Sequence, residues 1–350
     1  MTGLYTDDIC RCALLKDLSK SLIEASRDHS ASLFFAQRQR QLGMPFVVAT
    51  RPVFCARCQM ESLDEYFDVA LALVKTSGNL ISEYTTGCKS FEKKSCDIDL
   101  VTEIDKKVEQ TLIDGLSQQF PTHKFIGEES VAGGAKCELT DAPTWIIDPV
   151  DGTLNFIHGF PHSCISVGLA INKECLAGII YNPIIQQLFT AKKGQGAFLN
   201  GRQIHVSNIK VLREALVAFE CGTSRDEERC KNVLENFKKI VSNGHGMRSL
   251  GSAALNMAMV AMGGADANFE FGIHAWDIAA GDIIVREAGG VCLDPAGGPL
   301  DLLSRRVLCA STPELAKEIT ETLVQPSIVR SLRTVTVGLN DYLPFLMCNS

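Results

Sequence analysis

Two aspartates, Asp148 and Asp151, stand three residues apart directly after an apolar run. The run 144–147 is β-branched and aromatic, which is typical of a buried strand, so we expect Asp148 where that strand leaves the sheet. Together with the backbone carbonyl of Val150 and the hydroxyl of Thr153, the two carboxylates form a set of hard oxygen donors. Such donors bind Mg²⁺ along with the phosphate of a substrate.

The residues around these aspartates also favour a turn. Pro149 removes a backbone donor, Gly152 permits a tight bend, and Thr153 suits a helix N-cap. A strand that ends in an ordinary polar turn accounts for the same residues, because Asp-Pro and Asp-Gly pairs are common in turns. This stretch alone therefore leaves both interpretations open.

Further acids stand at the ends of predicted elements. Glu128 follows the short apolar strand 125–127, and Asp277 lies near the start of a helix. If the fold brings both to Asp148 and Asp151, like charges about 4 Å apart repel by roughly 4 kcal/mol at an effective dielectric of about 20. These motifs contain no Lys or Arg, so divalent cations are the natural way to neutralise them. All-oxygen ligation favours Mg²⁺, with Mn²⁺ as a substitute, over zinc.

Such a cluster suits the cleavage of phosphate esters. Two ions about 3.5–4 Å apart activate a water and stabilise the leaving oxygen. Backbone amides at two predicted helix starts, Gly152-Thr153 and Gly251-Ser252-Ala253, are candidates to hold phosphate oxygens. The chain contains no P-loop and no Gly-x-Ser-x-Gly motif. Direct attack by an activated water is therefore the simplest mechanism.

Two of the acidic positions have structural explanations as well. Asp105 falls near the start of a predicted helix that runs to about Phe120, where the helix dipole favours a carboxylate. A solvated turn accounts equally for the adjacent acids Glu128 and Glu129. A functional role for any of them needs support from elsewhere.

The remaining pattern predicts an antiparallel sheet beside helices in the first half and an α/β layer in the second. We expect helices at 63–84, 105–120, 227–240, 251–262, 274–288 and 313–323. We expect further strands at 163–171, 175–182, 187–191, 215–220, 265–271, 291–293 and 307–310. A tight connection is predicted at 172–174.

Bulk properties exclude several classes of protein. The chain has 350 residues, a net charge of −7 and 46% hydrophobic residues. This charge gives no general affinity for nucleic acid or anionic membranes, and no apolar run is long enough to span a membrane. The 14 cysteines are scattered and complete no zinc site. We therefore expect reduced thiols and a cytoplasmic protein.

The pattern divides the chain into a central domain and two extensions. We expect an N-terminal extension at 1–59 that is poorly ordered, and its acidic residues argue against a mitochondrial transit peptide. The central domain covers 60–325, with an α+β half at 60–206 and an α/β half at 207–325. Residues 326–350 lose the pattern and form a tail.

Several motifs together resemble the inositol monophosphatase family, over about 61–323. They are Asp99–Asp105, Gly127–Glu129, Asp148–Phe156, Trp276–Gly281, Glu287–Gly290 and Gly298–Leu302. The resemblance implies the five-layered αβαβα sugar-phosphatase fold, a homodimer, dependence on two to three Mg²⁺ ions and inhibition by Li⁺. It also implies hydrolysis of myo-inositol monophosphates, which serves inositol synthesis and recycling and phosphatidylinositol signalling.

The resemblance implies particular metal ligands. One ion would be held by Glu128, Asp148 and the Val150 carbonyl, and a second by Asp148, Asp151 and Asp277. A third, weaker ion would rely on Glu128 and water.

The resemblance also implies roles in catalysis and specificity. Thr153 and Asp105 resemble the pair that orients and deprotonates the attacking water. Asp151, Ala253 and Glu270 resemble the residues that contact the inositol ring. A site built to bind hydroxyl groups rejects analogues that lack them, so Glu270 would influence substrate choice.

Some alternatives remain beside this interpretation. A related Li⁺-sensitive phosphatase could act on another small sugar or nucleotide phosphate, and a non-catalytic scaffold could keep the same fold. A scaffold predicts the loss of a ligand or of the Thr–Asp pair, and the sequence retains all of them. Gly159 stands where close relatives often carry Arg, which could alter the rim of the site or a partner contact. A calcium-binding loop would need a different spacing of acids.

Overall fold

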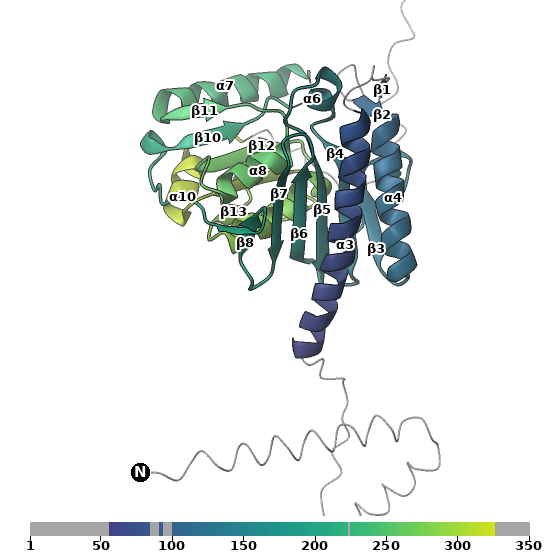
Figure 1. Ribbon diagram of the computed structural model, residues 1–350. Helices are drawn as coiled ribbons and strands as arrows, with labels where there is room; N and C mark the ends of the chain where they lie inside the picture. Colours follow the sequence, from purple (N-terminus) through teal and green to yellow (C-terminus); the bar gives the residue numbers. More distant parts are fainter. Residues whose placement is uncertain (1–55, 85–90, 94–99, 223–224, 326–350) are drawn as a thin grey trace, which may run out of the picture. The chain divides into compact units, whose positions relative to one another are not determined.

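The computed structural model describes residues 56–84, 91–93, 100–222 and 225–325. Nearly all of the predicted N-terminal extension and all of the predicted tail 326–350 lie outside the described residues. In the described part, two large β-sheets alternate with helices (Figure 1). None of the described helices combines the length and the apolar character needed to cross a membrane.

The first large sheet has seven strands in the order β3-β4-β5-β6-β7-β8-β9. Their bounds are β3 (Lys124–Gly127), β4 (Thr144–Asp151), β5 (Cys164–Ile171), β6 (Glu174–Asn182), β7 (Gln187–Lys192), β8 (Ala197–Leu199) and β9 (Arg202–Ile204). β3 and β4 are parallel, and the other neighbours are antiparallel. Asn172 and Lys173 join β5 to β6 with φ of 54° and 65°. The tight connection predicted there is confirmed, since paired positive φ values suit a two-residue hairpin.

The second large sheet has five strands in the order β11-β10-β12-β14-β13. Their bounds are β10 (Leu216–Phe219), β11 (Gly246–Arg248), β12 (Ala267–Phe271), β13 (Val291–Leu293) and β14 (Arg306–Ala310). β10 is parallel to both of its neighbours, whereas β14 is antiparallel to β12 and β13. A small antiparallel pair, β1 (Phe91–Lys93) and β2 (Leu100–Thr102), lies outside both large sheets.

Helices separate and cover these sheets (Figure 1). Helices α3 (Ala56–Tyr84) and α4 (Glu103–Gln119) cover the seven-stranded sheet, and α8 (Ala253–Ala261) and α9 (Ala275–Glu287) lie between the two sheets. Helices α7 (Glu227–Asn243) and α10 (Pro313–Thr322) cover the outer face of the five-stranded sheet. Two short helices, α5 (Glu128–Ala132) and α6 (Thr153–His158), follow β3 and β4. The predicted αβαβα order is confirmed.

Alternating side chains supply the cores between the layers. On β4, Trp145 and Ile147 pack toward α3 and α4, whereas Ile146 packs toward α8 and α9. Two glycines let α9 lie directly on the sheet, because a Cβ on Gly168 would come within 2.8 Å of Ala279 and one on Gly178 within 2.6 Å of the Ala280 carbonyl oxygen. This close contact fixes α9 over β5 and β6.

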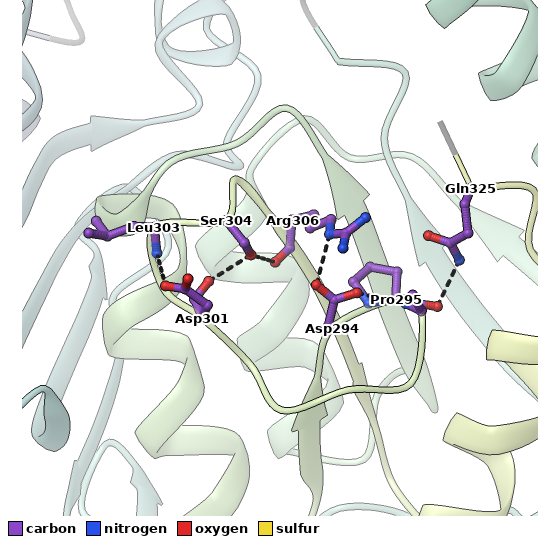
Figure 2. Close-up of polar contacts among 8 residues, drawn as sticks. Asp294, Pro295, Asp301, Leu303, Ser304, Arg306 and Gln325 are labelled. Carbon is purple, nitrogen blue, oxygen red and sulfur yellow. Dashed lines mark hydrogen bonds and ion pairs between the residues drawn. The ribbon is translucent and has the colours of Figure 1, made fainter. Parts of the chain in front are cut away.

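The connection between β13 and β14 is tied down at both ends, as Figure 2 shows. Arg306 Nε and Asp294 Oδ2 form an ion pair at 2.8 Å. Gln325 Nε2 donates to the Pro295 carbonyl at 2.8 Å. The last described residue is therefore anchored to this connection.

Candidate active site

The aspartates of the opening motif lie on either side of a β-bulge at the end of β4. Asp148 pairs with Ser166 on β5, and Asp151 pairs with Cys164, so three steps along β4 match two steps along β5. The prediction that the strand ends at Asp148 is therefore wrong, because the bulge absorbs the extra residue and β4 continues to Asp151. A bulge redirects the side chains next to it. Here those side chains are the carboxylates of Asp148 and Asp151.

Gly152 makes the turn from β4 into α6. Its φ is 84°, and a Cβ there would lie 2.9 Å from the His162 carbonyl and 3.0 Å from the Gly251 carbonyl. Gly152 is the N-cap and Thr153 is the first helical residue, so the predicted N-cap is wrong by one position. The left-handed backbone explains the difference, since glycine adopts it without a steric penalty.

The hydroxyl of Thr153 faces Asp105, which comes from a distant part of the chain. Thr153 Oγ1 lies 3.2 Å from Asp105 Oδ1 and 2.9 Å from the Val150 carbonyl oxygen. The other oxygen of Asp105 accepts the Thr102 backbone N–H at 3.0 Å and also the Thr102 hydroxyl. Asp105 thus caps α4, as its predicted place near the helix start indicates, and directs its second oxygen at Thr153.

Asp277 enters the site from the first turn of α9. Its Oδ2 accepts the His274 backbone N–H at 2.5 Å, which fixes the carboxylate against the helix start. The His274 ring stacks on Trp276 with centroids 4.5 Å apart. The Ser166 hydroxyl donates to the Trp276 carbonyl at 3.1 Å. These contacts join the start of α9 to β5, beside the end of β4.

Asp148, Asp151 and Asp277 form one cluster. An oxygen from each carboxylate lies within 4.8 Å of the other two. Burial raises the pKa of Asp151 and raises that of Asp277 well above the usual range, where the charge of Asp151 adds to the effect. Three clustered carboxylates at this depth need cations or protons as partners. Their oxygen donors fit Mg²⁺, which prefers carboxylates.

The start of α8 holds Asp151 in place. Asp151 Oδ2 accepts the Ser252 hydroxyl at 2.5 Å and the Ala254 backbone N–H at 2.8 Å. The thiol of Cys164 lies 3.8 Å from the same oxygen. The predicted substrate-binding residues Ser252 and Ala253 therefore lie beside the carboxylate cluster, and both are buried.

Glu128 lies at the start of α5, directly after β3, and is half-buried. A second acid, Glu109 on α4, holds this helix start by accepting the N–H groups of Glu129 and Ser130, each at 2.8 Å. A Cβ on Gly127 would lie 2.5 Å from the Glu109 carboxyl carbon, so the glycine makes room for this contact. Sequence reasoning missed Glu109, although an acid within the stripe of a buried helix is a usable signal.

Glu270 lies on β12 and is buried. Burial raises its pKa well above the usual range, and the charges of Glu220, Asp151 and Asp277 add to this shift. Asn256 Nδ2 connects the two glutamates, at 2.8 Å from Glu220 Oε1 and 3.4 Å from Glu270 Oε1. The carboxyl of Glu270 therefore belongs to the same electrostatic environment as the aspartate cluster.

Glu220, which sequence reasoning also missed, holds the loop before α8. Its Oε1 accepts the N–H groups of Leu250 at 2.6 Å and Gly251 at 2.8 Å, and its Oε2 accepts the Ser249 hydroxyl at 2.8 Å. From the other side, Asn155 Nδ2 donates to the Leu250 carbonyl at 2.6 Å. The Gly251 amide predicted to hold phosphate is thus directed at a carboxylate of the protein. An acid at the end of a predicted strand was the available signal for Glu220.

The structure brings together most of the predicted residues. The three aspartates share one cluster, the Val150 carbonyl and Asp105 meet at Thr153, and Ser252 touches Asp151. Glu128 lies outside the group of three, but its charge helps to raise the pKa of Asp277.

A model of the inositol monophosphatase family matches residues 62–327. The chain belongs to the inositol monophosphatase family. It is 47% identical over 256 residues to Inositol monophosphatase 1 of Homo sapiens, and the match covers 73% of this chain and 92% of the human protein. The family predicted from the motifs is therefore confirmed, and with it the prediction of a hydrolase.

Solved structures of the family share the fold. The inositol monophosphatase from Anabaena (Nostoc) matches with a TM-score of 0.66 and 31% identity, over 76% of this chain and 98% of that one. Staphylococcal IMPase-II, solved with inositol monophosphate bound, matches with a TM-score of 0.62 and 27% identity, over 74% of this chain and 94% of that one. A further structure of SaIMPase-II contains 2′-AMP, with a TM-score of 0.63, 27% identity and coverage of 76% and 95%.

Proposed function

We propose that this chain hydrolyses myo-inositol monophosphates to myo-inositol and phosphate in a Mg²⁺-dependent reaction. The observation that carries the proposal is the cluster of Asp148, Asp151 and Asp277, with carboxylate oxygens within 4.8 Å of one another. Support comes from the name of the human relative and from the inositol monophosphate bound to the staphylococcal enzyme. The reaction would serve inositol synthesis and recycling and phosphatidylinositol signalling.

The donor set fits two to three Mg²⁺ ions. Glu128, Asp148 and the Val150 carbonyl are proposed to hold one ion, and Asp148, Asp151 and Asp277 a second. The Val150 oxygen accepts one hydrogen bond, from Thr153, and a carbonyl has a second lone pair to offer. When bound, the ions would neutralise the carboxylates, polarise the phosphate and favour ionisation of a water. Li⁺ is proposed to inhibit by competing at this site.

Thr153 and Asp105 are proposed to receive the proton of the attacking water. Thr153 Oγ1 accepts that proton while its own proton moves to Asp105 Oδ1, 3.2 Å away. The water oxygen then bonds to phosphorus, the bond to the inositol oxygen breaks, and the leaving oxygen takes a proton from solvent. Because Thr102 occupies the other oxygen of Asp105, Oδ1 is directed toward Thr153 before substrate arrives.

Substrate contacts are proposed around the same cluster. The amides of Gly152 and Thr153 would face phosphate oxygens, next to Ser252 and Ala253 at the start of α8. Glu270 would bond an inositol hydroxyl, either as acceptor when ionised or as donor when its raised pKa keeps it protonated. A phosphate ester of a smaller or less polar alcohol would leave the buried Glu270 carboxyl without a hydrogen-bond partner. Such an analogue should therefore react more slowly.

Phosphate release from myo-inositol 1-phosphate tests this function. We expect release that requires Mg²⁺ and falls when millimolar Li⁺ is added. Absence of release from folded protein with Mg²⁺ present would contradict the proposal. The measurement should include 2′-AMP, because SaIMPase-II was solved with that nucleotide. A higher kcat/KM for 2′-AMP than for the inositol phosphate would favour a nucleotide phosphatase instead.

Two further properties are proposed on the same basis. We expect a homodimer, which sedimentation would detect as twice the mass of the chain. We also expect a cytoplasmic enzyme with reduced thiols. The cytoplasm keeps thiols reduced, so no disulfide is expected in the protein there. Disulfides in the protein isolated from cells would argue against this location.

A further inference from the structure

The carboxyl of Glu270 contacts a buried amide that has one unused atom. Asn256, on α8, is fully buried, and its Nδ2 donates to Glu220 Oε1 at 2.8 Å and to Glu270 Oε1 at 3.4 Å. Its Oδ1 accepts no hydrogen bond at normal geometry from the described residues. A buried acceptor without a partner is unfavourable, so this oxygen needs a donor.

A side chain with a matching unused donor lies beside this amide. His162 belongs to the loop between α6 and β5, and within the described part of the chain its buried Nε2 also has no partner at normal geometry. Asn155 Nδ2 donates to the His162 carbonyl at 2.8 Å and to the Leu250 carbonyl at 2.6 Å, so this loop lies against the segment before α8. Burial lowers the pKa of His162, and the charge of Glu220 and a polar contact with Asn256 partly offset this effect. The imidazole is therefore largely neutral near pH 7 and lies close to both side chains.

The two unused atoms are complementary. A neutral imidazole that carries its proton on Nε2 donates from that atom, and an amide oxygen accepts. A water is the competing partner for Asn256 Oδ1, since a cavity of about 220 Å³ adjoins this side chain. The side chains that line the cavity are apolar except those of Arg248 and Asn256, so a water there would find few of the two to four polar partners it needs. The imidazole of His162 is the better partner.

We propose that His162 is a positioning residue, which acts through Asn256 on the substrate contact of Glu270. Its Nε2–H donates to Asn256 Oδ1 and holds the amide in the orientation in which Nδ2 faces both glutamates. A fixed Nδ2 holds one oxygen of Glu270 and leaves the other for a hydroxyl group of the alcohol half of the substrate. His162 thereby contributes to the selection of alcohols that carry hydroxyl groups. This inference rests on the proposed function, in which Glu270 bonds an inositol hydroxyl.

The selectivity between two substrates tests the proposal. Myo-inositol 1-phosphate carries ring hydroxyls, whereas the aryl ester p-nitrophenyl phosphate has none. The ratio of kcat/KM for the inositol ester to kcat/KM for the aryl ester would be measured in three variants. His162→Leu removes the donor, His162→Gln replaces it with an amide N–H, and His205→Leu removes an exposed histidine. We expect His162→Leu to lower the ratio about fivefold or more, the factor that about 1 kcal/mol from one hydrogen bond produces. His162→Gln and His205→Leu should leave it within about twofold.

A double variant tests the route through Asn256. Asn256→Leu removes the amide while keeping a side chain of similar size, and its melting temperature shows whether it has folded. In this background His162→Leu should change the ratio by less than about twofold, because its partner is gone. The single variants decide the matter if Asn256→Leu does not fold.

The outcomes separate this inference from the proposed function. An unchanged ratio in His162→Leu, while the unmodified chain hydrolyses myo-inositol 1-phosphate, would overturn the inference alone. A fivefold loss that persists in the Asn256→Leu background would also overturn it, because His162 would then act by another route. No release from myo-inositol 1-phosphate by the folded, unmodified chain with Mg²⁺ would overturn the proposed function and this inference together.

Discussion

Replacing Glu220 by Ala should disable the site although Glu220 belongs to none of the motifs that indicate the chemistry. Its carboxylate holds the loop 249–252 through the N–H groups of Leu250 and Gly251. That loop in turn places Ser252, whose hydroxyl donates to Asp151. Without the carboxylate, the loop keeps only the contact from Asn155, and Ser252 holds Asp151 less firmly.

The structure gives the size of this effect. Glu220 accepts two part-buried bonds, from Leu250 N and Asn256 Nδ2. A hydrogen bond to a charged group contributes about 1.5–3 kcal/mol, and water that enters the loop recovers part of it. A net loss of about 2–4 kcal/mol in the catalytic arrangement lowers the rate about 30- to 900-fold. We therefore expect kcat/KM for myo-inositol 1-phosphate to fall at least about 30-fold.

Two matched variants separate this explanation from general damage. Glu220→Gln keeps an oxygen acceptor without the charge, so about half of each bond energy remains and the loss should be nearer tenfold. Ser249→Ala removes one exposed donor and should stay within about twofold. Steady-state kinetics and thermal unfolding measure all three. Activity of Glu220→Ala within about threefold of the unmodified chain, with an unchanged melting temperature, would refute the reasoning.

Three further predictions concern the surroundings of the site. Thr153→Ala should lower kcat about 10²-fold or more and Thr153→Ser by less than about tenfold, because only serine keeps a hydroxyl for proton transfer; equal kcat values in steady-state assays would exclude that path. Gly127→Ala should cost about 1–3 kcal/mol in unfolding free energy, since its Cβ would press on Glu109, and a melting temperature equal to that of the unmodified chain would contradict this. Burial lowers the pKa of His123, whose Nδ1 accepts the Trp145 indole N–H at 3.0 Å. The unfolded chain therefore binds this proton more readily, and the unfolding free energy should fall as pH drops below about 6.5. Urea titrations should show a flatter pH dependence in His123→Gln, and an equally steep one would count against the assignment.

Much of the site could be predicted because its residues are local features of the sequence. Asp148 and Asp151 follow a buried strand within one short motif, and Asp277 stands in the first turn of a clear helix. Their convergence is a tertiary property, which the family resemblance supplied and the periodicity did not.

The supporting contacts were not predictable in the same way. Glu109 meets the start of α5 across 20 residues, and Glu220 meets Leu250 across 30. The sequence pattern around each glutamate does not indicate which segment it will contact, because that contact depends on how the helices and sheets pack together. Strands β8, β9 and β11 were also not predicted from the sequence. Each has three residues, which is too few to show an alternation with a period of two.

The bulge in β4 shows a third limit. The residues after Asp148 favour a turn by their types. They nevertheless continue strand β4, because the pairing with β5 accommodates one extra residue. Local preference and sheet pairing compete there, and pairing prevails.

Asp148→Asn provides the most direct test of the central claim, that this cluster of carboxylates carries a Mg²⁺-dependent phosphatase reaction. Phosphate release from myo-inositol 1-phosphate would be followed as Mg²⁺ is titrated, with Asp141→Asn, an exposed position before β4, as the control. We predict near-total loss of turnover in Asp148→Asn at every Mg²⁺ concentration, with the fold retained, and normal turnover in the control. Full Mg²⁺-dependent turnover in Asp148→Asn would contradict the account.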